Sequence, residues 1–285
     1  LATDMPMRSL AYTCERLGLI GLDYDVAIKS TDKAAMIEAF AQHNVAHPWF
    51  YIVEDGFNID EILSEISYPC ITKPTDSSGS RGVVIAQNEK EFVKAITYSS
   101  ANSRKGKVIV EELMIGKEVS VEIIIYKGVP YILQVTDKLT TGAPHFVEIG
   151  HSQPSCLSAE TVNAVEELAI KAIKAVGLEN GAVHAEIMVT EDGPKMIELG
   201  ARLGGDCITT HLVPLSTGID MVKAVIDLCL GDKPELTTKY KKSSAIKFIR
   251  TVPGKIENIQ GIDNAKEIKG VTNIEFMKNV GDIVN

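Results

Sequence analysis

Two glutamates in one predicted hairpin have a spacing that could serve metal chemistry. Glu186 and Glu198 are equally far from Asp192 in the sequence, so a three-residue loop at 191–193 would place them directly opposite each other. Their separation is even, so both side chains would leave the same face of the strands. Facing carboxylates repel unless a counter-charge lies between them, and oxygen ligands suit Mg²⁺. The hairpin therefore predicts a magnesium site, and a solvated polar face is the alternative.

A lysine followed by a loop of small polar residues could bind phosphate. Lys73 ends a β-rich run, and the loop 76–82 (DSSGSRG) separates it from a second β-rich run at 83–86. Small residues leave backbone N–H groups accessible to an anion, so we expect either a flap over phosphates or an exposed hairpin turn. The loop does not match the P-loop pattern G-x-x-x-x-G-K-[ST]. The candidate binding residues of the flap are Ser77, Ser78, Gly79 and Ser80.

Two further basic residues are candidates for anion binding. Lys33 begins a predicted helix, where a single lysine is most often a solvated surface residue. Arg202 follows Glu198 by four residues and precedes Gly204 and Gly205. Glycines after a strand allow close approach of a ligand, and an arginine can bind an oxyanion or acyl phosphate through two hydrogen bonds. The glycine spacing does not fit the dinucleotide pattern G-x-G-x-x-G. We therefore expect a substrate or phosphate contact here, with an ordinary loop as the alternative.

Carboxylates near the end of one predicted strand suit a nucleoside. Glu111, Glu112 and Leu113 end the strand 107–113, and Glu118 begins the next strand. The backbone groups at a strand end are available to pair with the edge of adenine. A nearby carboxylate can accept hydrogen bonds from both ribose hydroxyls. A charged turn is the alternative.

Two histidines accompany these carboxylates. Glu148 and His151 lie in a predicted loop, 137–157, and are candidates for recognising the amino group of a substrate. A polar loop with no special role is the alternative. His184 shares the predicted face of Glu186, so it either lies near the metal pocket or is a hydrogen-bonded structural histidine.

Composition limits the classes of function. The chain has 285 residues, enough for about two domains. Its net charge of −9 argues against a general nucleic-acid partner, because phosphate backbones need a basic surface. No apolar run approaches the roughly 18 residues that span a bilayer, so we expect no membrane partner. The five cysteines are scattered without a C-x-x-C pair, which is typical of a reducing compartment and predicts a cytoplasmic protein.

Short helices and strands that alternate in no strict βαβ order predict an α+β fold. The predicted helices are 7–17, with Leu10, Ala11, Cys14 and Leu17 as its apolar stripe, then 33–44, 59–66, 89–100, 158–176 and 218–231. The predicted strands are 47–53, 107–113, 118–126 and 129–135, with the strand–flap–strand around Lys73 and a hairpin at 182–200. A smaller α+β tail begins near residue 245.

Taken in order, these segments resemble the ATP-grasp superfamily from about residue 20 to residue 230. The matching segments are STDKAAM, ITKPTDSSGSRGV, VIVEELMIGKEVSVE and VHAEIMVTEDGPKMIELGARLGGD. The phrases ELGARLGGD and PHFVEIGHSQPS are most similar to carboxylate–amine ligases of the L-amino-acid-ligase type. The chain is also similar to phosphoribosylglycinamide synthetase and to the large chain of carbamoyl-phosphate synthase.

The resemblance implies an ATP-grasp fold, in which two α+β subdomains clasp the nucleotide. It implies that 1–30 is the end of an N-terminal Rossmann-like domain, that 31–235 is the ATP-grasp domain, and that 236–285 begins a C-terminal α+β subdomain. Within the ATP-grasp domain, 31–115 would clasp the nucleotide and 116–235 would hold metal and substrate. Both ends of the chain are expected to be cuts through a larger protein.

The resemblance also implies residue roles. Lys73 would contact ATP phosphate and adenine, Lys33 would add a phosphate contact, and the flap would close over the triphosphate. Adenine would lie against Glu111, Glu112 and Leu113, ribose would bind Glu118, and Arg202 would bind phosphate. Glu186 and Glu198 would hold Mg²⁺, with Mn²⁺ as a substitute. Many members have an asparagine ligand where this chain has Gly200, so the coordination differs.

The activity implied is an ATP-dependent ligase. ATP would phosphorylate a carboxylate, and an amine would attack the acyl phosphate to give an amide, ADP and phosphate. The substrates would be an amino acid or similar small metabolites, and a homodimer is plausible for this superfamily. The alternatives are a phosphoribosylglycinamide-synthetase-like or carbamoyl-phosphate-type ligase, a kinase that stops at phosphoryl transfer, and a nucleotide-binding module without catalysis.

Overall fold

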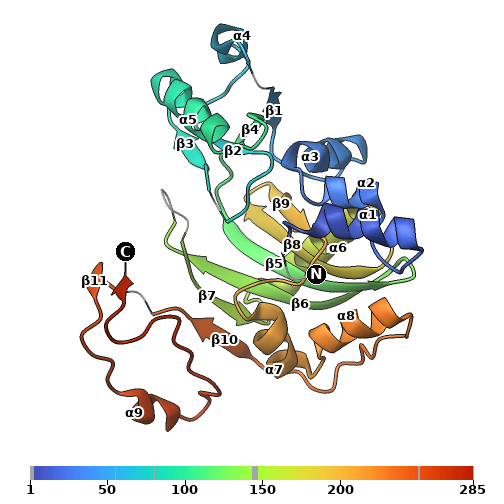
Figure 1. Cartoon of the computed structure of the whole chain (residues 1–285), viewed down its shortest axis with the longest axis vertical. Helices are drawn as coiled ribbons and strands as arrows, with labels where there is room; N and C mark the ends of the chain where they lie inside the picture. Colours follow the sequence, from blue (N-terminus) through green and yellow to red (C-terminus); the bar gives the residue numbers. More distant parts are fainter. Residues whose placement is uncertain (1–2, 55, 80, 143–146, 250, 285) are drawn as a thin grey trace. The chain divides into compact units, whose positions relative to one another are not determined.

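The computed structural model describes residues 3–54, 56–79, 81–142, 147–249 and 251–284 (Figure 1). The chain divides into two compact units, 1–247 and 248–285. The first unit contains all the predicted site residues that the structure describes. No helix among the described residues is long and apolar enough to cross a membrane.

The first unit begins with three helices, α1 (Met7–Leu17), α2 (Tyr24–Lys29) and α3 (Lys33–Gln42). The bounds predicted for α1 are confirmed, but its predicted apolar stripe is partly wrong. The helix buries Met7 together with Ala11 and Cys14, whereas Leu17 is 67% exposed and Leu10 is also exposed. The helix turns the face with Met7, Ala11 and Cys14 to the core, so Leu10 and Leu17 lie on its exposed side.

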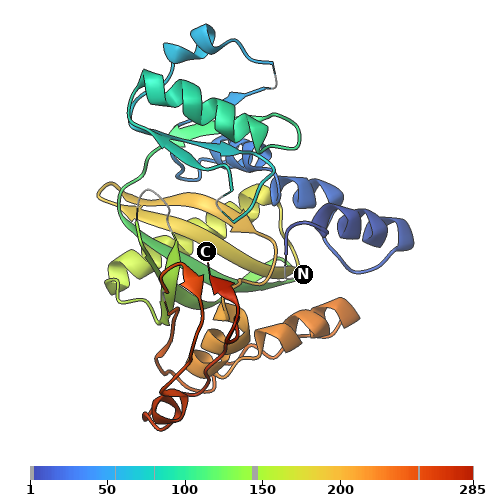
Figure 2. The ribbon, with the colours of Figure 1, turned by 60° about the vertical axis from the view of Figure 1, so that its left-hand side comes forward.

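A four-stranded antiparallel sheet follows, in the order β1-β4-β2-β3. Its strands are β1 (Phe50–Val53), β2 (Cys70–Pro74), β3 (Val84–Ala86) and β4 (Val108–Glu112). The helix α5 (Glu89–Ala101) packs on β2 and β3, as Figure 2 shows. It buries Phe92 and Ile96 in the core on this side of the sheet. The short α4 (Ile59–Leu63) lies between β1 and β2 in the sequence. Asn88 caps α5 by accepting a hydrogen bond from the backbone N–H of Glu91, as its capping-box sequence predicts.

A six-stranded antiparallel sheet follows, in the order β10-β7-β6-β5-β8-β9. Its strands are β5 (Lys117–Tyr126), β6 (Val129–Thr140), β7 (Glu148–Gln153), β8 (Gly181–Thr190), β9 (Gly193–Gly200) and β10 (Ser244–Lys247). The long helix α6 (Ala159–Val176) covers one face of this sheet (Figure 1). The apolar residues of β5 alternate with polar ones, and Val119, Val121 and Ile123 pack into the core beneath α6.

The opposite face of β5 and β8 is polar at its centre. Ser120 lies directly opposite Glu186, and Glu122 lies directly opposite His184. The same face turns apolar at Ile124, which packs against α8 (Met221–Leu230). Two further short helices, a π-helix η1 (Ile208–Leu212) and α7 (Val213–Thr217), complete this side of the unit. The six-stranded sheet therefore carries a buried polar layer on the face that α6 leaves uncovered.

The predicted loop at 137–157 is wrong in part. Strand β6 continues to Thr140, and β7 pairs with it, so that Glu148 and His151 lie on a strand. Polar side chains leave both faces of β7, and no hydrophobic alternation marks the segment as a strand. Its pairing with β6 and β10 holds it in the sheet.

The second unit contains a two-stranded sheet of β11 (Gly254–Lys255) and β12 (Ile283–Val284), with the helix α9 (Ile262–Lys266) between them in the sequence. The α+β class predicted from the sequence is confirmed by the elements of the first unit.

Candidate functional site

A pocket lies between the four-stranded sheet and the six-stranded sheet of the first unit. Most predicted nucleotide-binding and metal-binding residues line this pocket, together with the predicted substrate-binding residue Glu148: Lys33, Lys73, Ser77, Ser78, Gly79, Glu111, Glu112, Leu113, Glu118, Glu186 and Glu198. Ser80, which the sequence also predicts, lies outside the described residues. The structure therefore brings together side chains that are far apart in the sequence.

One part of the pocket wall is apolar. Ile71 and Val83 come from the strand–flap–strand segment, Leu113 follows β4, and Met188 and Ile197 come from the β8–β9 hairpin. Such a wall suits a flat base, with backbone groups after β4 for its polar edge. Two ion pairs border this wall: Lys73 pairs with Glu111, and Lys195 Nζ lies 2.9 Å from Glu112 Oε2.

Lys33 connects the flap to the β8–β9 hairpin. Its Nζ donates to the backbone oxygen of Ser77 at 3.0 Å and to Glu198 Oε1 at 2.9 Å. The lysine is the first residue of α3, whose N-terminus is capped by the side chain of Asp32. Burial lowers the pKa of Lys33, but Glu198 outweighs this and raises it, so the side chain is a cation in the pocket.

The two predicted metal carboxylates face each other across β8 and β9. Glu186 pairs directly with Glu198, which confirms their predicted opposition. The predicted three-residue loop is wrong, because Thr190 pairs with Gly193 and only two residues form the turn. A register shift between Glu186 and Ile187 restores the opposition. A bulge adds one residue to one strand, so the tighter turn and the bulge compensate each other.

Lys138 is a pocket residue that the sequence reasoning missed. Its side chain is 10% exposed and contacts three carboxylates, at 2.6 Å from Glu118 Oε1, 2.9 Å from Glu148 Oε1 and 3.3 Å from Glu186 Oε2. Burial lowers the pKa of Lys138, but the three carboxylates outweigh it and raise the pKa. The sequence pattern that could have indicated Lys138 is the alternation of polar residues in β6, which places Lys138 on the same face as Gln134 and Thr136.

His184 lies beside Glu186, one of the two predicted metal ligands, as its parity with Glu186 predicts. Its Nδ1 lies 2.7 Å from Glu122 Oε1, and its Nε2 lies 3.3 Å from Glu186 Oε1. Burial lowers the pKa of His184, but the two carboxylates outweigh it and raise the pKa to about 10. Burial raises the pKa of Glu186, but Lys138 and His184 outweigh it and hold the pKa well below its usual range.

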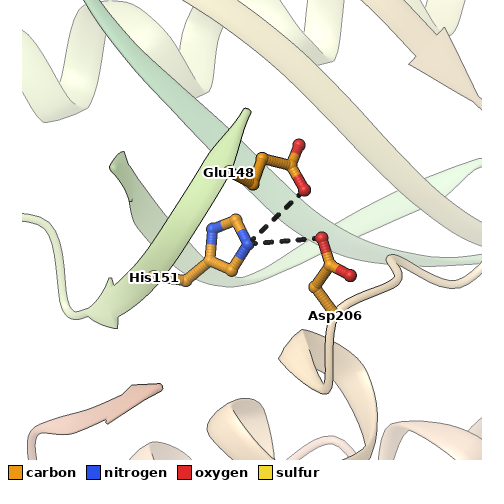
Figure 3. A group of neighbouring side chains, drawn as sticks. All are labelled: Glu148, His151 and Asp206. Carbon is orange, nitrogen blue, oxygen red and sulfur yellow. Dashed lines mark ion pairs between the residues drawn. The ribbon is translucent and has the colours of Figure 1, made fainter. Parts of the chain in front are cut away.

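Glu148 and His151 meet a third side chain, Asp206 (Figure 3). His151 Nε2 lies 3.9 Å from Glu148 Oε2 and 3.5 Å from Asp206 Oδ2. One ligand atom from each residue lies within 4.8 Å of the others, a spacing that a cation or an ammonium group could occupy. Hydrogen bonds from His151 and Glu148 lower the pKa of Asp206, whereas burial and Asp206 raise that of Glu148. Asp206 lies in the loop after β9, where no regular spacing relates it to Glu148 and His151, so it could not be predicted from the sequence.

Arg202, Gly204 and Gly205 do not line the pocket in the described part of the chain. Arg202 Nε donates to Asp4 Oδ1 at 2.7 Å, and its Nη1 donates to the backbone oxygen of Leu203 at 3.1 Å. The arginine lies within electrostatic range of Glu186 and Glu198: burial lowers the pKa of Arg202, and Asp4 followed by Glu186 and Glu198 outweighs burial and raises it. A Cβ at Gly200 would lie 3.2 Å from Arg202 Cγ, so the missing side chain at 200 leaves room for the arginine.

The pocket is enclosed by two α+β layers and contains a flap of small residues, lysines and facing carboxylates. This arrangement is that of a nucleotide-clasping fold. Residues 66–210 match the family described as the ATP-grasp domain. This match covers half of the chain, and the chain belongs to the ATP-grasp family.

The chain is similar to proteins of related architecture. It is 30% identical over 251 residues to the alanine–anticapsin ligase of Bacillus subtilis, an alignment that covers 80% of this chain and 52% of that protein. The crystal structure of an L-amino acid ligase from Bacillus licheniformis superposes with a TM-score of 0.86 at 24% identity, over 99% of this chain and 70% of that one, which shows the fold. The phosphoribosylglycinamide synthetase of Anaerococcus prevotii superposes with a TM-score of 0.73 at 25% identity, over 100% of this chain and 72% of that one. The chain spans about half the length of the curated relatives it matches first.

Proposed function

We propose that the protein is an ATP-dependent carboxylate–amine ligase that forms an amide through an acyl phosphate and releases ADP and phosphate. The observation that carries the proposal is the facing pair Glu186 and Glu198 in a pocket shared with Lys33 and Lys73. Carboxylates for a divalent cation and lysines for phosphate oxygens are what transfer of a phosphoryl group from ATP requires. The similar proteins named alanine–anticapsin ligase and phosphoribosylamine–glycine ligase support amide formation as the second step.

The proposed position of ATP follows the chemistry of the pocket wall. Adenine lies against the apolar wall and pairs with backbone groups around Glu111, Glu112 and Leu113. The ribose hydroxyls donate to Glu118. The triphosphate lies under the flap, where Lys33, Lys73 and the backbone of Ser77, Ser78 and Gly79 bind its oxygens, and Ser80 is included by its place in the flap sequence.

The donor set of Glu186 and Glu198 fits Mg²⁺, because it consists of carboxylate oxygens that leave the same face and lie directly opposite each other. Mn²⁺ suits the same oxygens. The bound cation would neutralise charge on the transferred phosphoryl group. Lys33 contacts Glu198 and Lys138 contacts Glu186, and these two lysines offset part of the carboxylate charge.

Substrate recognition is assigned to the residues next to the proposed position of the ATP phosphates. Glu148 and His151, joined by Asp206, offer acceptors for the amino group of an amino-acid substrate. Arg202 binds the acyl phosphate after its side chain has released Asp4. The loop that contains Gly204 and Gly205 allows the substrate to approach the backbone closely. Arg202 and Lys73 are the proposed catalytic residues, because both can stabilise charge on the transferred phosphoryl group.

The remaining assignments are part of the same proposal. Residues 1–30 are the end of an N-terminal Rossmann-like domain, and 31–235 are the ATP-grasp domain with the subdomains 31–115 and 116–235. Residues 236–285 begin a C-terminal α+β subdomain. The protein acts on small-molecule carboxylates and amines in the cytoplasm, to which the scattered cysteines point. The homodimer suggested by family resemblance stays a prediction.

A screen of amino acids, singly and in pairs, with Mg²⁺ and ATP tests the proposal when ADP and free phosphate are followed together. We expect ADP and phosphate to rise in equal amounts only with a specific pair, and Glu198→Gln to abolish both. ADP formation with one substrate and without free phosphate would instead identify a kinase.

A further inference from the structure

His184 lies between two carboxylates that serve different purposes. Glu186 lines the pocket, whereas Glu122 is 0% exposed and does not line it. The two ring nitrogens of the histidine each face one carboxylate oxygen, at 2.7 Å on the Glu122 side and 3.3 Å on the Glu186 side. The imidazole therefore connects a fully buried carboxylate to a pocket carboxylate.

The sheet fixes the geometry of this connection. Glu122 on β5 pairs directly with His184 on β8, and Glu186 follows two residues later on the same face. The hydroxyl of Ser120, which pairs with Glu186, donates to Glu122 Oε1 at 3.0 Å. Four side chains on two adjacent strands are thus held by register as well as by hydrogen bonds.

The loop after β9 closes over the histidine. A Cβ at Gly204 would lie 2.7 Å from His184 Nδ1 and 2.8 Å from Glu122 Oε2. Only a residue without a side chain fits there while the histidine and the glutamate keep their places. The backbone of the loop therefore confines the imidazole from the side opposite the strands.

Stability alone does not account for a buried Glu122. Replacing buried ion pairs by apolar residues of similar volume is often neutral or stabilising, because desolvation offsets the attraction. The contacts described for this glutamate lead to Ser120 and His184, and through His184 to Glu186. A side chain that orients a metal ligand through a histidine has a functional reason to be buried.

The other oxygen of Glu186 is also held. Lys138 Nζ lies 3.3 Å from Glu186 Oε2, while His184 faces Oε1. The carboxylate of Glu186 is therefore contacted on both of its oxygens, and these two contacts restrict its rotation.

We propose that His184, held by Glu122, is a positioning residue that fixes the carboxylate of Glu186 for divalent-cation binding. This inference rests on the proposed function, because it assumes that Glu186 is a metal ligand. Glu122 touches neither substrate nor cation and acts only through the histidine.

The test measures binding of Mn²⁺ to the whole protein in the presence of ADP, with free Mn²⁺ followed by electron paramagnetic resonance. Glu122→Gln keeps the shape of the side chain and does not touch Glu186. We expect it to weaken Mn²⁺ binding by about 10- to 100-fold, the range seen when a partner of a metal ligand is removed. Binding of ADP without the metal should stay unchanged, because the apolar wall and the flap are not altered.

The matched control is Thr136→Val on the neighbouring strand β6. Thr136 is 0% exposed and accepts a hydrogen bond from Gln153 Nε2 at 2.9 Å, so the change also removes a buried polar contact from this sheet face. We expect the control to lower Tm and to leave Mn²⁺ affinity within a factor of two of the wild type. If Glu122→Gln does not fold, His184→Leu and His184→Gln replace it. His184→Gln, which keeps an N–H donor, should retain more affinity for Mn²⁺ than His184→Leu.

The positioning role alone would be overturned if Glu122→Gln bound Mn²⁺ with wild-type affinity. It would also be overturned if Glu122→Gln and Thr136→Val lost equal amounts of Mn²⁺ affinity. Equal affinities of His184→Leu and His184→Gln would do the same. A wild-type protein that binds ADP but no Mn²⁺ would overturn the proposed metal site, and this inference with it.

Discussion

Lys138 offers the sharpest test of the electrostatics of the pocket. The variant Lys138→Met keeps the length of the side chain and removes its charge, which leaves Glu118, Glu148 and Glu186 without the cation that contacts all three. Breaking a buried ion pair by removing one partner costs about 3–5 kcal/mol. The carboxylates are partly exposed, at 17%, 33% and 23% of their side chains, so we use the lower end, about 3 kcal/mol. At roughly 2–4 °C per kcal/mol, Tm should fall by about 6–12 °C.

The effect of Lys138→Met should depend on pH in a defined direction. The pKa of Glu186 is lowered in the folded state, so its contribution to stability is present above its unfolded pKa and is lost as the pH falls. The loss of Tm should therefore be larger at pH 7 than at pH 4.5. Mg²⁺ should raise the Tm of the variant more than that of the wild type, because the cation replaces the missing charge.

Thermal unfolding followed by circular dichroism, without nucleotide, measures these shifts. The control is Lys223→Met, which removes a lysine that pairs with Asp227 on the surface of α8 and is 65% exposed. We expect no measurable change of Tm in the control. A Tm of Lys138→Met within 2 °C of the wild type at pH 7, or a larger loss at pH 4.5 than at pH 7, would refute the reasoning.

Three further outcomes are expected. Gly82→Ala should lower Tm more than Gly79→Ala, because both glycines have positive φ but only at residue 82 would a Cβ meet packed atoms; equal shifts would contradict this. Burial raises the pKa of the Cys70 thiol to about 11, so iodoacetamide at pH 8 should label the exposed Cys229 and leave Cys70 unlabelled until the protein unfolds, as peptide mass spectrometry would detect. Folding raises the pKa of His184 from 6.5 to about 10, so its contribution to stability is full below pH 6.5 and is lost as the pH rises through 10; His184→Gln should flatten the fall of Tm between pH 7 and pH 10.

The part of the site that could be predicted from the sequence lies on elements with local signals. The β8–β9 hairpin has a turn and an even spacing, so the opposition of Glu186 and Glu198 could be predicted although the turn is shorter than expected. The flap is marked by small residues between β-rich runs, and Lys73 by its place at a strand end. The helix α6 has a complete apolar stripe and formed within one residue of its predicted bounds.

The residues that were missed depend on pairing between distant strands. Lys138 is one lysine among many, and only the register of β6 with β5 places it beside Glu118. Glu122 gave no signal because its partner His184 is 62 residues away in the sequence. The strand β7 lacks hydrophobic alternation, since its neighbours in the sheet, and not its own side chains, stabilise it as a strand.

Trapping of an acyl phosphate with hydroxylamine tests the central claim most directly, because it needs no knowledge of the natural amine. The wild-type protein is incubated with Mg²⁺, ATP, hydroxylamine and pools of amino acids, and hydroxamate and ADP are measured together. The ligase account predicts hydroxamate and ADP in equal amounts with one pool, and neither with Glu198→Gln. ADP release without hydroxamate, or hydroxamate formation that survives Glu198→Gln, would contradict it.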